Sequence, residues 1–392
     1  MKLKTHNIIL VLHIILMYMY IWRSLFEGLG IYSLSYVISI LLVGVNVVSS
    51  LLRKYKGMRQ NIFLDMYIVF AIIGFIVSIF SRGFVVSLMG IAAVLLNLMI
   101  WKYSKILAVD TKSDVLNLFC RYFMFAMIIN AIAGIYQYFV DPSVFGLVTG
   151  IFGDESIMSA SNVTRRAVGF MGTPQVYSAS CGVALFVAEN IKNPKRRVII
   201  QILLLVSGLL SGSRAFGVFA ILFVLYITVK MSPVKRAFCV IGACVVLAVA
   251  LLYVGDQLSE IDTLFRNFDF TRWAASKVYF SSFNEFKWHE FLLGKGYGLE
   301  GWSNNLSDIS FDYSATESCL ISIVYQLGII AAFIFIFAFI VVFFRAKNNR
   351  VGRFLVVGIF INLCCTPAFA GFAFSYLAWP IILMINNNFK FK

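Results

Sequence analysis

Long apolar runs recur along the whole chain, and they constrain its fold more than any other feature. Each run is close to the roughly 20 residues that a helix needs to cross the hydrocarbon core of a bilayer. Twelve such segments are predicted, at 7–22, 30–52, 61–80, 84–101, 115–140, 171–189, 198–211, 215–229, 237–255, 318–344, 353–368 and 371–386. The last two share one apolar stretch, divided at Thr366-Pro367 and Gly371, so eleven spans are the nearest alternative.

The spanning segments are expected to be helices. Backbone groups in lipid must be hydrogen-bonded within the protein, which leaves helices or a closed β-barrel. Barrel strands would be about ten residues long and would alternate in polarity, unlike these runs. Only 13% of the residues are charged, whereas a soluble domain carries roughly 25%. We therefore expect an all-α, polytopic integral membrane protein and exclude a soluble nucleotide-binding or nucleic-acid-binding enzyme.

Basic residues alternate in density along the chain. Of the 33 Lys and Arg residues, 22 fall in seven short segments, ten lie on the other side of the spans, and Arg121 lies inside one. The seven segments are 2–4, 53–59, 102–112, 192–197, 230–236, 345–353 and 390–392. By the positive-inside rule they face the cytoplasm, so both termini are expected inside. The net charge of +15 then reports membrane topology, and no nucleic-acid partner is expected.

Three regions follow from this topology. Residues 1–255 carry nine spans and a smaller external loop at 141–170, residues 256–316 form a large external loop, and residues 317–392 carry the last three spans. Counted over 256–317, the large loop has ten acidic and five basic residues in a chain that is basic overall. Its aromatic residues have spacings that suit short helices lying on the membrane surface. The same rings could instead stack on sugars.

Arg214 is the external cation with the most distinctive surroundings. It follows Ser211-Gly212-Ser213 at the tip of a hairpin between two short spans. From Arg197 to Arg214 a helix extends about 25 Å, less than the roughly 30 Å of a bilayer core, so the tip is expected to sink below the membrane surface. Small residues there would leave backbone amides free to bind an anion. The alternative is an interfacial arginine that extends to lipid headgroups.

Four further arginines fall in the external loops. They are Arg165, Arg166, Arg266 and Arg272. Arginine grips phosphate oxygens with two parallel hydrogen bonds. Arginines that converge at the outer membrane face would therefore bind a lipid-linked phosphate or pyrophosphate. Solvated residues in a flexible loop are the alternative for Arg165 and Arg166.

Two residues could act as a general base on a sugar hydroxyl. Glu317 opens the tenth span at the mouth of the expected cavity, and His289 is the external histidine, which could titrate near neutral pH. Each also has a plain structural interpretation, since a carboxylate favours the first turn of a helix and a surface histidine needs no partner. The histidines are scattered and the cysteines lie in or at the edges of spans, so no metal site and no cofactor are expected.

Several short motifs follow one another in the second half of the chain. They are Gly169-Phe170-Met171-Gly172-Thr173-Pro174, Ser211-Gly212-Ser213-Arg214, Arg272-Trp273, Leu293-Gly294-Lys295-Gly296-Tyr297-Gly298, Glu317-Ser318 and Tyr325-Gln326-Leu327-Gly328-Ile329-Ile330. Their order over residues 165–330, together with the topology of the whole chain, resembles the O-antigen polymerase and ligase superfamily of membrane glycosyltransferases.

The resemblance implies a GT-C-like fold in the bacterial inner membrane, with the active face in the periplasm. The donor would be an oligosaccharide on undecaprenyl pyrophosphate, with membrane lipid and a chain-length regulator protein as further partners. Arg214 and Arg272 would hold the pyrophosphate, the Gly294–Gly298 turn would shape the large loop, and Glu317 would line the cavity.

Three activities stay open. A polymerase transfers the growing glycan to the sugar end of another lipid-linked repeat unit, whereas a ligase transfers it to lipid A core. Ligases resemble one another in a loop histidine, and His289 does not clearly occupy the corresponding place, which favours the polymerase. A flippase of the same lipid would also suit twelve spans. The halves show no repeat, and the middle of the spans carries few charges, which disfavours a carrier.

Overall fold

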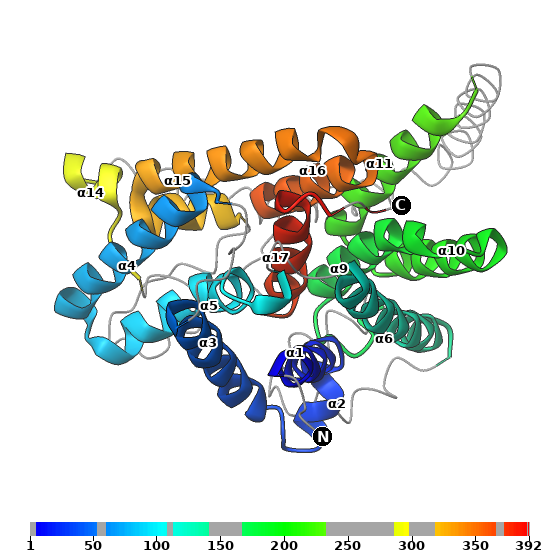
Figure 1. The fold of residues 1–392 in the computed structure, drawn as a ribbon, viewed down its shortest axis with the longest axis horizontal. Helices are drawn as coiled ribbons and strands as arrows, with labels where there is room; N and C mark the ends of the chain where they lie inside the picture. The colour runs from blue at the N-terminus through cyan, green and yellow to red at the C-terminus, as the bar shows by residue number, and fades with distance from the viewer. Residues whose placement is uncertain are drawn as a thin grey trace, which may run out of the picture.

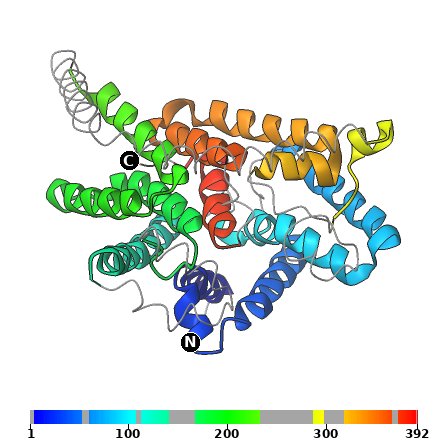
Figure 2. The same cartoon turned by 180° about the vertical axis from the view of Figure 1, so that it is seen from behind.

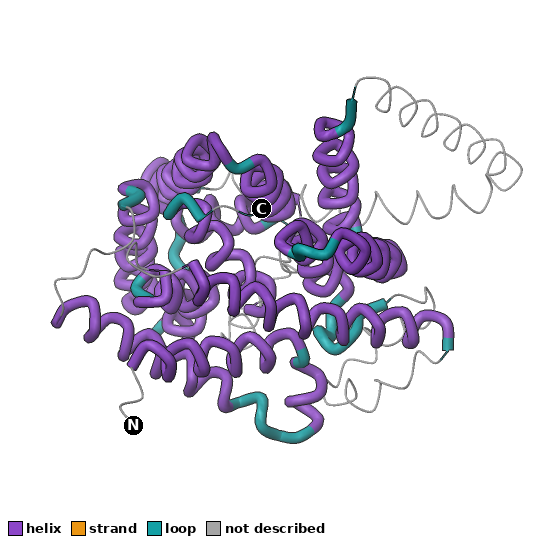
Figure 3. Tube along the Cα trace, turned by 45° about the vertical axis from the view of Figure 1, so that its right-hand side comes forward, coloured by secondary structure: helices purple, strands orange, loops and turns teal. Residues whose placement is uncertain are grey.

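The computed structural model describes residues 5–52, 60–107, 113–140, 167–232, 286–297, 318–365, 372–389 and 391. Within these ranges the chain forms helices and connecting loops, with no strand (Figure 3). The predicted all-α class is therefore confirmed for the part of the chain that the structure describes. Three helices there are long and apolar enough to cross a membrane, at 62–82, 115–139 and 319–348.

Eleven of the predicted segments coincide with helices to within a few residues. The helices are α1 (Thr5–Ile21), α3 (Leu34–Leu52), α4 (Ile62–Arg82), α5 (Phe84–Lys102), α6 (Ser113–Phe139), α9 (Pro174–Val187), α10 (Pro194–Leu210), α11 (Arg214–Lys230), α15 (Cys319–Arg345), α16 (Arg350–Cys365) and α17 (Phe372–Asn386). The predicted span at 237–255 lies outside the described residues. The total of twelve spans stays a prediction.

Two short α-helices lie between the long ones. Helix α2 (Arg23–Gly28) forms where the sequence predicts a plain loop, and α14 (Trp288–Leu293) lies in the large external loop. The Trp288 side chain is 76% exposed, as expected for a ring at a membrane surface. Among the described residues there are also three 3-10 turns, η1 (Lys105–Leu107), η3 (Ala188–Asn190) and η6 (Ala346–Asn348).

Helix starts follow from local sequence. Pro174 and Pro194 occupy the first turns of α9 and α10, where proline removes no needed hydrogen bond. The side chains of Ser213 and Ser318 accept backbone N–H bonds at the starts of α11 and α15. Such capping satisfies donors that a helix leaves open in its first turn.

Helix α17 lies at the centre of the molecule (Figures 1 and 2). It contacts α5 and α15 of one group of helices and α9 of the other. The first group comprises α3, α4, α5 and α15, and the second comprises α6, α9, α10 and α11. Large apolar side chains point outward on the periphery, with Phe80 and Phe344 87% and 68% exposed. Extensive exposed apolar surface is unusual for a soluble protein and agrees with a membrane environment.

Hydrogen bonds between helix ends agree with the predicted alternation of helix directions. At the predicted cytoplasmic end, Arg345 donates to Asn386 at 2.6 Å and to the Gln60 carbonyl at 2.7 Å. At the other end, which we name the external end, Ser24 donates to the Phe170 carbonyl at 2.8 Å. Each bond joins segments that the charge pattern places on one side. Which end faces the cytoplasm stays a prediction.

Candidate functional site

The Gly169–Pro174 motif is held inside the helix bundle by two amides of α6. Gln137 Oε1 accepts from Val168 N at 3.0 Å and from Gly169 N at 3.1 Å. Asn130 Oδ1 accepts from Phe170 N at 2.7 Å. Both amide side chains are buried. They accept the backbone hydrogen bonds that water would otherwise accept in an irregular segment. Irregular backbone is tolerated at membrane depth only where protein, or water in a cavity, pairs its N–H and C=O groups.

The same segment meets the hairpin between α10 and α11. Ala167 N donates to the Leu210 carbonyl at 3.0 Å, next to the turn formed by Ser211, Gly212 and Ser213. Because Leu210 directly precedes the turn, two motifs more than 35 residues apart are brought together at the external end. The helices on either side, α10 and α11, are 17 residues each, or about 25 Å long, and the predicted sinking of the tip below the membrane surface stays a prediction.

The hairpin turn does not offer the free amides that the sequence predicts. Gly212 N donates to the Leu209 carbonyl at 3.0 Å. Ser213 N donates to Ser211 Oγ, and Ala215 N donates to Ser213 Oγ, each at 3.3 Å. The two serine hydroxyls therefore accept hydrogen bonds from amides of the turn itself. An anion bound here would depend on the guanidinium of Arg214. Arg214 begins α11, and its side chain lies outside what the structure describes.

A second motif pair meets at a break in α15. Gly328 has φ 85° and ψ 170°, so the helix is interrupted about 14 Å from its start at Cys319. The Tyr325 and Gln326 carbonyls, which an unbroken helix would pair four residues ahead, instead accept from Lys295 N at 3.0 Å and Gly296 N at 2.9 Å. A turn of the large external loop is thus inserted among the helices, where its amides pair the two carbonyls that the break in α15 leaves open. The sequence predicts that this loop lies on the membrane surface, so the insertion differs from the prediction.

Tyr297 anchors the inserted turn, which we define as residues 293–297. Its side chain is fully buried, and its backbone N–H donates to Ser78 Oγ on α4 at 2.5 Å. The ring lies directly on α5, because a Cβ atom added at Gly90 would lie 2.5 Å from Tyr297 Cβ. Tyr297 Oη has no hydrogen-bond partner among the residues that the structure describes.

Two basic residues lie in or near the inserted turn, Lys295 within it and Arg82 on α4. Neither was identified from the sequence as a site residue. Lys295 Nζ lies 4.1 Å from the centre of the Phe286 ring and 5.9 Å from that of Tyr325. Arg82 is half-buried and ends α4 one helical turn beyond Ser78, whose Oγ accepts from Tyr297 N of the inserted turn. A signal for Arg82 was present, because Ser81-Arg82-Gly83 joins two apolar spans as Ser213-Arg214 does.

The structure tests only part of the predicted site. His289 lies on α14 and is exposed, beside Glu290, whose Oε2 accepts from Lys287 N at 2.9 Å. The remaining predicted residues lie outside the described ranges: Arg165, Arg166, Arg266, Arg272 and Glu317. Ser318, the neighbour of Glu317, caps α15 by accepting from Ile321 N at 3.3 Å. Whether these groups converge stays a prediction.

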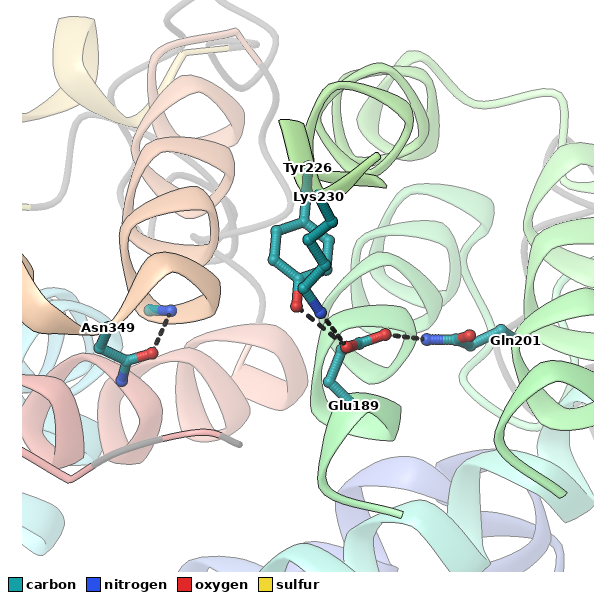
Figure 4. A network of polar contacts seen from close by, with 6 residues as sticks. Glu189, Gln201, Tyr226, Lys230 and Asn349 are labelled. Carbon is teal, nitrogen blue, oxygen red and sulfur yellow. Dashed lines mark hydrogen bonds and ion pairs between the residues drawn. The ribbon is translucent and has the colours of Figure 1, made fainter. Parts of the chain in front are cut away.

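A polar network at the predicted cytoplasmic end is fully paired (Figure 4). Glu189 Oε2 accepts from Lys230 Nζ at 2.7 Å and from Tyr226 Oη at 2.9 Å. Glu189 Oε1 accepts from Gln201 Nε2 at 2.8 Å. Nearby, Asn349 Oδ1 accepts from the backbone of Gly352. Because both of its carboxylate oxygens accept from side chains of α10 and α11, we interpret Glu189 as a structural residue that joins these two helices.

A second buried network surrounds His13 in α1. The ring nitrogens lie 3.0 Å from Tyr376 Oη and 3.1 Å from Ser104 Oγ. Tyr376 Oη donates to the His13 carbonyl, so its one proton is used and His13 Nδ1 must donate to it. His13 Nε2 is then the acceptor for Ser104. This arrangement connects α1, α5 and α17 and is structural.

No three metal-binding side chains come together in the part of the chain that the structure describes. Comparisons with protein-family models and with curated proteins give no match to this chain.

Proposed function

We propose that this chain is a membrane glycosyltransferase that polymerises lipid-linked oligosaccharide repeat units. It would transfer the glycan from undecaprenyl pyrophosphate to the non-reducing end of another lipid-linked unit, at the periplasmic face of the bacterial inner membrane. The proposal includes a GT-C-like arrangement of about twelve spans.

One observation supports the proposal above the others. Two irregular segments, 167–172 and 293–297, are held among the helices by bonds from their backbone amides, toward the end that the charge pattern predicts to be external. Such backbone at membrane depth is tolerated only where protein buries it or where it lines a water-filled cavity, and we interpret these two segments as the walls of a substrate site. Both segments belong to motifs on which the resemblance depends, and each meets a second such motif there.

The proposed reaction breaks the bond between the anomeric carbon and the pyrophosphate and forms a glycosidic bond to the acceptor hydroxyl. The electron pair leaves with the pyrophosphate, which stays on its carrier, and the hydroxyl proton passes to a base. Arg214 and Arg272 would stabilise the leaving group, with Arg165, Arg166 and Arg266 as further contributors. Glu317 or His289 would accept the proton.

Gene deletion in the source bacterium tests the function. For a polymerase, gel analysis of surface glycan should show lipid A core that carries a single repeat unit. Unsubstituted core with polymer held on its carrier would instead indicate a ligase. Loss of every external repeat would indicate a flippase. Either of these two outcomes would contradict the proposal.

Complementation then tests the arginines. Arg214→Ala and Arg272→Ala should fail to restore long chains at wild-type protein levels, because one charge-assisted contact to the leaving group is worth about 100-fold or more in rate. Arg23→Ala is the matched control, because Arg23 is also predicted outside but pairs with Glu27 at 2.7 Å. Full chain lengthening by both arginine variants would refute their assigned role.

A further inference from the structure

Asn362 on α16 connects this helix to the helix start that carries Arg214. Its side chain is fully buried. Asn362 Nδ2 donates to the Ala215 carbonyl of α11 at 3.2 Å and to the Gly358 carbonyl of α16 at 3.0 Å. Ala215 directly follows Arg214, and Asn362 lies in the last turn of α16. The bond between the helices therefore meets α11 one residue from Arg214, at the end that the charge pattern predicts to be external.

Apolar contacts hold the first half of α11 against three other helices. Phe216 packs directly on α10, because a Cβ atom added at Gly208 would lie 2.2 Å from its ring. Phe219 lies between α9 and α16, because Cβ atoms added at Gly182 and Gly358 would lie 2.3 and 2.5 Å from that ring. Such contacts fix the position of α11 but are non-directional, whereas the hydrogen bond from α16 also constrains its orientation.

The position of its acceptor distinguishes Asn362 from an ordinary link between membrane helices. Polar side chains commonly hydrogen-bond across such helices and hold them together. The Ala215 carbonyl lies in the first turn of α11, so a shift there displaces the backbone of Arg214. The second half of α11 is less constrained, with Ile221 and Val224 64% and 52% exposed. Because a displacement of about 1 Å can lower a catalysed rate about 100-fold, a directed bond has its largest effect at the first turn.

We propose that Asn362 is a positioning residue for Arg214. Its bond to the Ala215 carbonyl holds the first turn of α11, and with it the backbone of Arg214, in the place from which the pyrophosphate is stabilised. Asn362 itself would touch neither substrate. The role of Arg214 in the reaction rests on the proposed function, whereas the hold on its backbone rests on the hydrogen bond alone.

Hydrogen exchange on the full chain in nanodiscs tests the positioning without any substrate. Asn362→Leu keeps the approximate size of the side chain but removes the donor, so the first turn of α11 should open more often. The amides of Phe216 and Gly217, which donate to the Ser213 carbonyl, should exchange about fivefold faster or more, the factor that one hydrogen bond contributes. Asn362→Ser should act alike, because a serine hydroxyl bonds to the carbonyl four residues back in its own helix and is too short for α11.

Asn46→Leu is the matched control for both variants. Asn46 is also fully buried, and its Nδ2 donates to the Ile100 carbonyl of a neighbouring helix at 2.9 Å. It lies on α3, in the other group of helices. Asn46→Leu therefore removes the same kind of bond, and it should leave exchange at Phe216 and Gly217 as in wild type.

Glycan transfer in lipid vesicles then tests whether the positioning acts through Arg214. With radiolabelled lipid-linked repeat units at saturation, Asn362→Leu should lower the transfer rate about tenfold or more, as misplacement of a catalytic group does. In the Arg214→Ala background the same substitution should lower the rate less than about twofold, because the group that it displaces is absent.

Three results would overturn the inference. Wild-type exchange at Phe216 and Gly217 in both Asn362 variants would show that the bond does not hold the first turn. Equally fast exchange in Asn46→Leu would show a general loosening of the bundle. Equal losses of rate with and without Arg214 would make Asn362 purely structural. Faster exchange in the Asn362 variants, with no transfer by wild-type protein, would uphold the positioning and contradict the proposed function, so the two failures are distinguishable.

Discussion

Gly294 lies against the backbone just before Gly328, and Gly328 lies against the backbone just before Gly294. Neither position has room for a side chain. A Cβ atom at Gly294 would lie 2.3 Å from the Gln326 carbonyl oxygen, and one at Gly328 would lie 2.1 Å from the Leu292 carbonyl oxygen. Both residues have positive φ, 81° and 85°. The inserted turn and the break in α15 therefore depend on each other.

Gly294→Ala and Gly328→Ala should each displace the inserted turn. We expect a lower melting temperature in detergent and loss of long glycan chains in complemented cells, because the clash is with backbone that cannot rotate away. Gly30→Ala is the matched control, since Gly30 has φ 71° but open space around a Cβ atom. It carries only the backbone strain of about 1–3 kcal/mol. Equal effects at Gly30 and Gly328 would show that contact between the segments is unimportant.

Tyr297 should contribute through its ring and not through its hydroxyl. Tyr297→Ala should lower the free energy of unfolding by about 3–5 kcal/mol, the usual cost of removing a buried aromatic ring. Tyr297→Phe should be neutral or stabilising, because the buried Oη has no partner in the structure and an unpaired buried hydroxyl is costly. Denaturation in detergent measures both. A large loss in Tyr297→Phe would reveal a missing partner for the hydroxyl.

Gln137 should control the order of the 167–170 segment. Gln137→Leu removes the acceptor of two amides, each of which costs about 1–3 kcal/mol when left unsatisfied. Hydrogen exchange at Val168 and Gly169 should therefore accelerate. Gln201→Leu is the control, because Gln201 is also a buried amide but bonds to Glu189 elsewhere. Unchanged exchange in Gln137→Leu would contradict the assigned hydrogen bonds.

Glu189 should be needed as the partner of three donors. Glu189→Ala leaves buried Tyr226 and Gln201 groups unsatisfied and should destabilise the chain by about 3–5 kcal/mol, the usual cost of breaking a buried ion pair. Lys230→Met leaves the Glu189 carboxylate, which is 7% exposed, without its cation, but it should cost less because Tyr226 and Gln201 still donate to that carboxylate. Melting temperatures of both variants, with the double variant, measure the coupling. Equal losses in the two single variants would show that the exposed lysine matters as much as the carboxylate.

Apolar run length predicts the helices well, because membrane thickness fixes how long such a run must be. The boundary between α16 and α17 follows from Thr366-Pro367, and Pro174 marks the start of α9. The break at Gly328 is different, because one glycine in a long apolar run does not prescribe a break. The break depends on a turn more than 30 residues away, and single-sequence periodicity does not report such a contact.

The candidate site, like the helices, could be predicted from the sequence only in part. The charge pattern identifies Arg214 as an unusual external residue, yet the serines beside it bond to their own turn. The inserted turn is absent from the prediction, because the bond from Tyr297 N to Ser78 Oγ joins residues 219 positions apart that only the folded chain brings together.

Reconstitution tests the central claim most directly. Purified protein in lipid vesicles would be supplied with undecaprenyl-pyrophosphate-linked repeat units extracted from the deletion strain, and products would be separated by gel. The account predicts a ladder of lengthened lipid-linked glycans, absent when Arg214→Ala protein is used and present with Arg23→Ala. Unchanged single repeat units with folded wild-type protein would contradict the proposal that this chain is a polymerase.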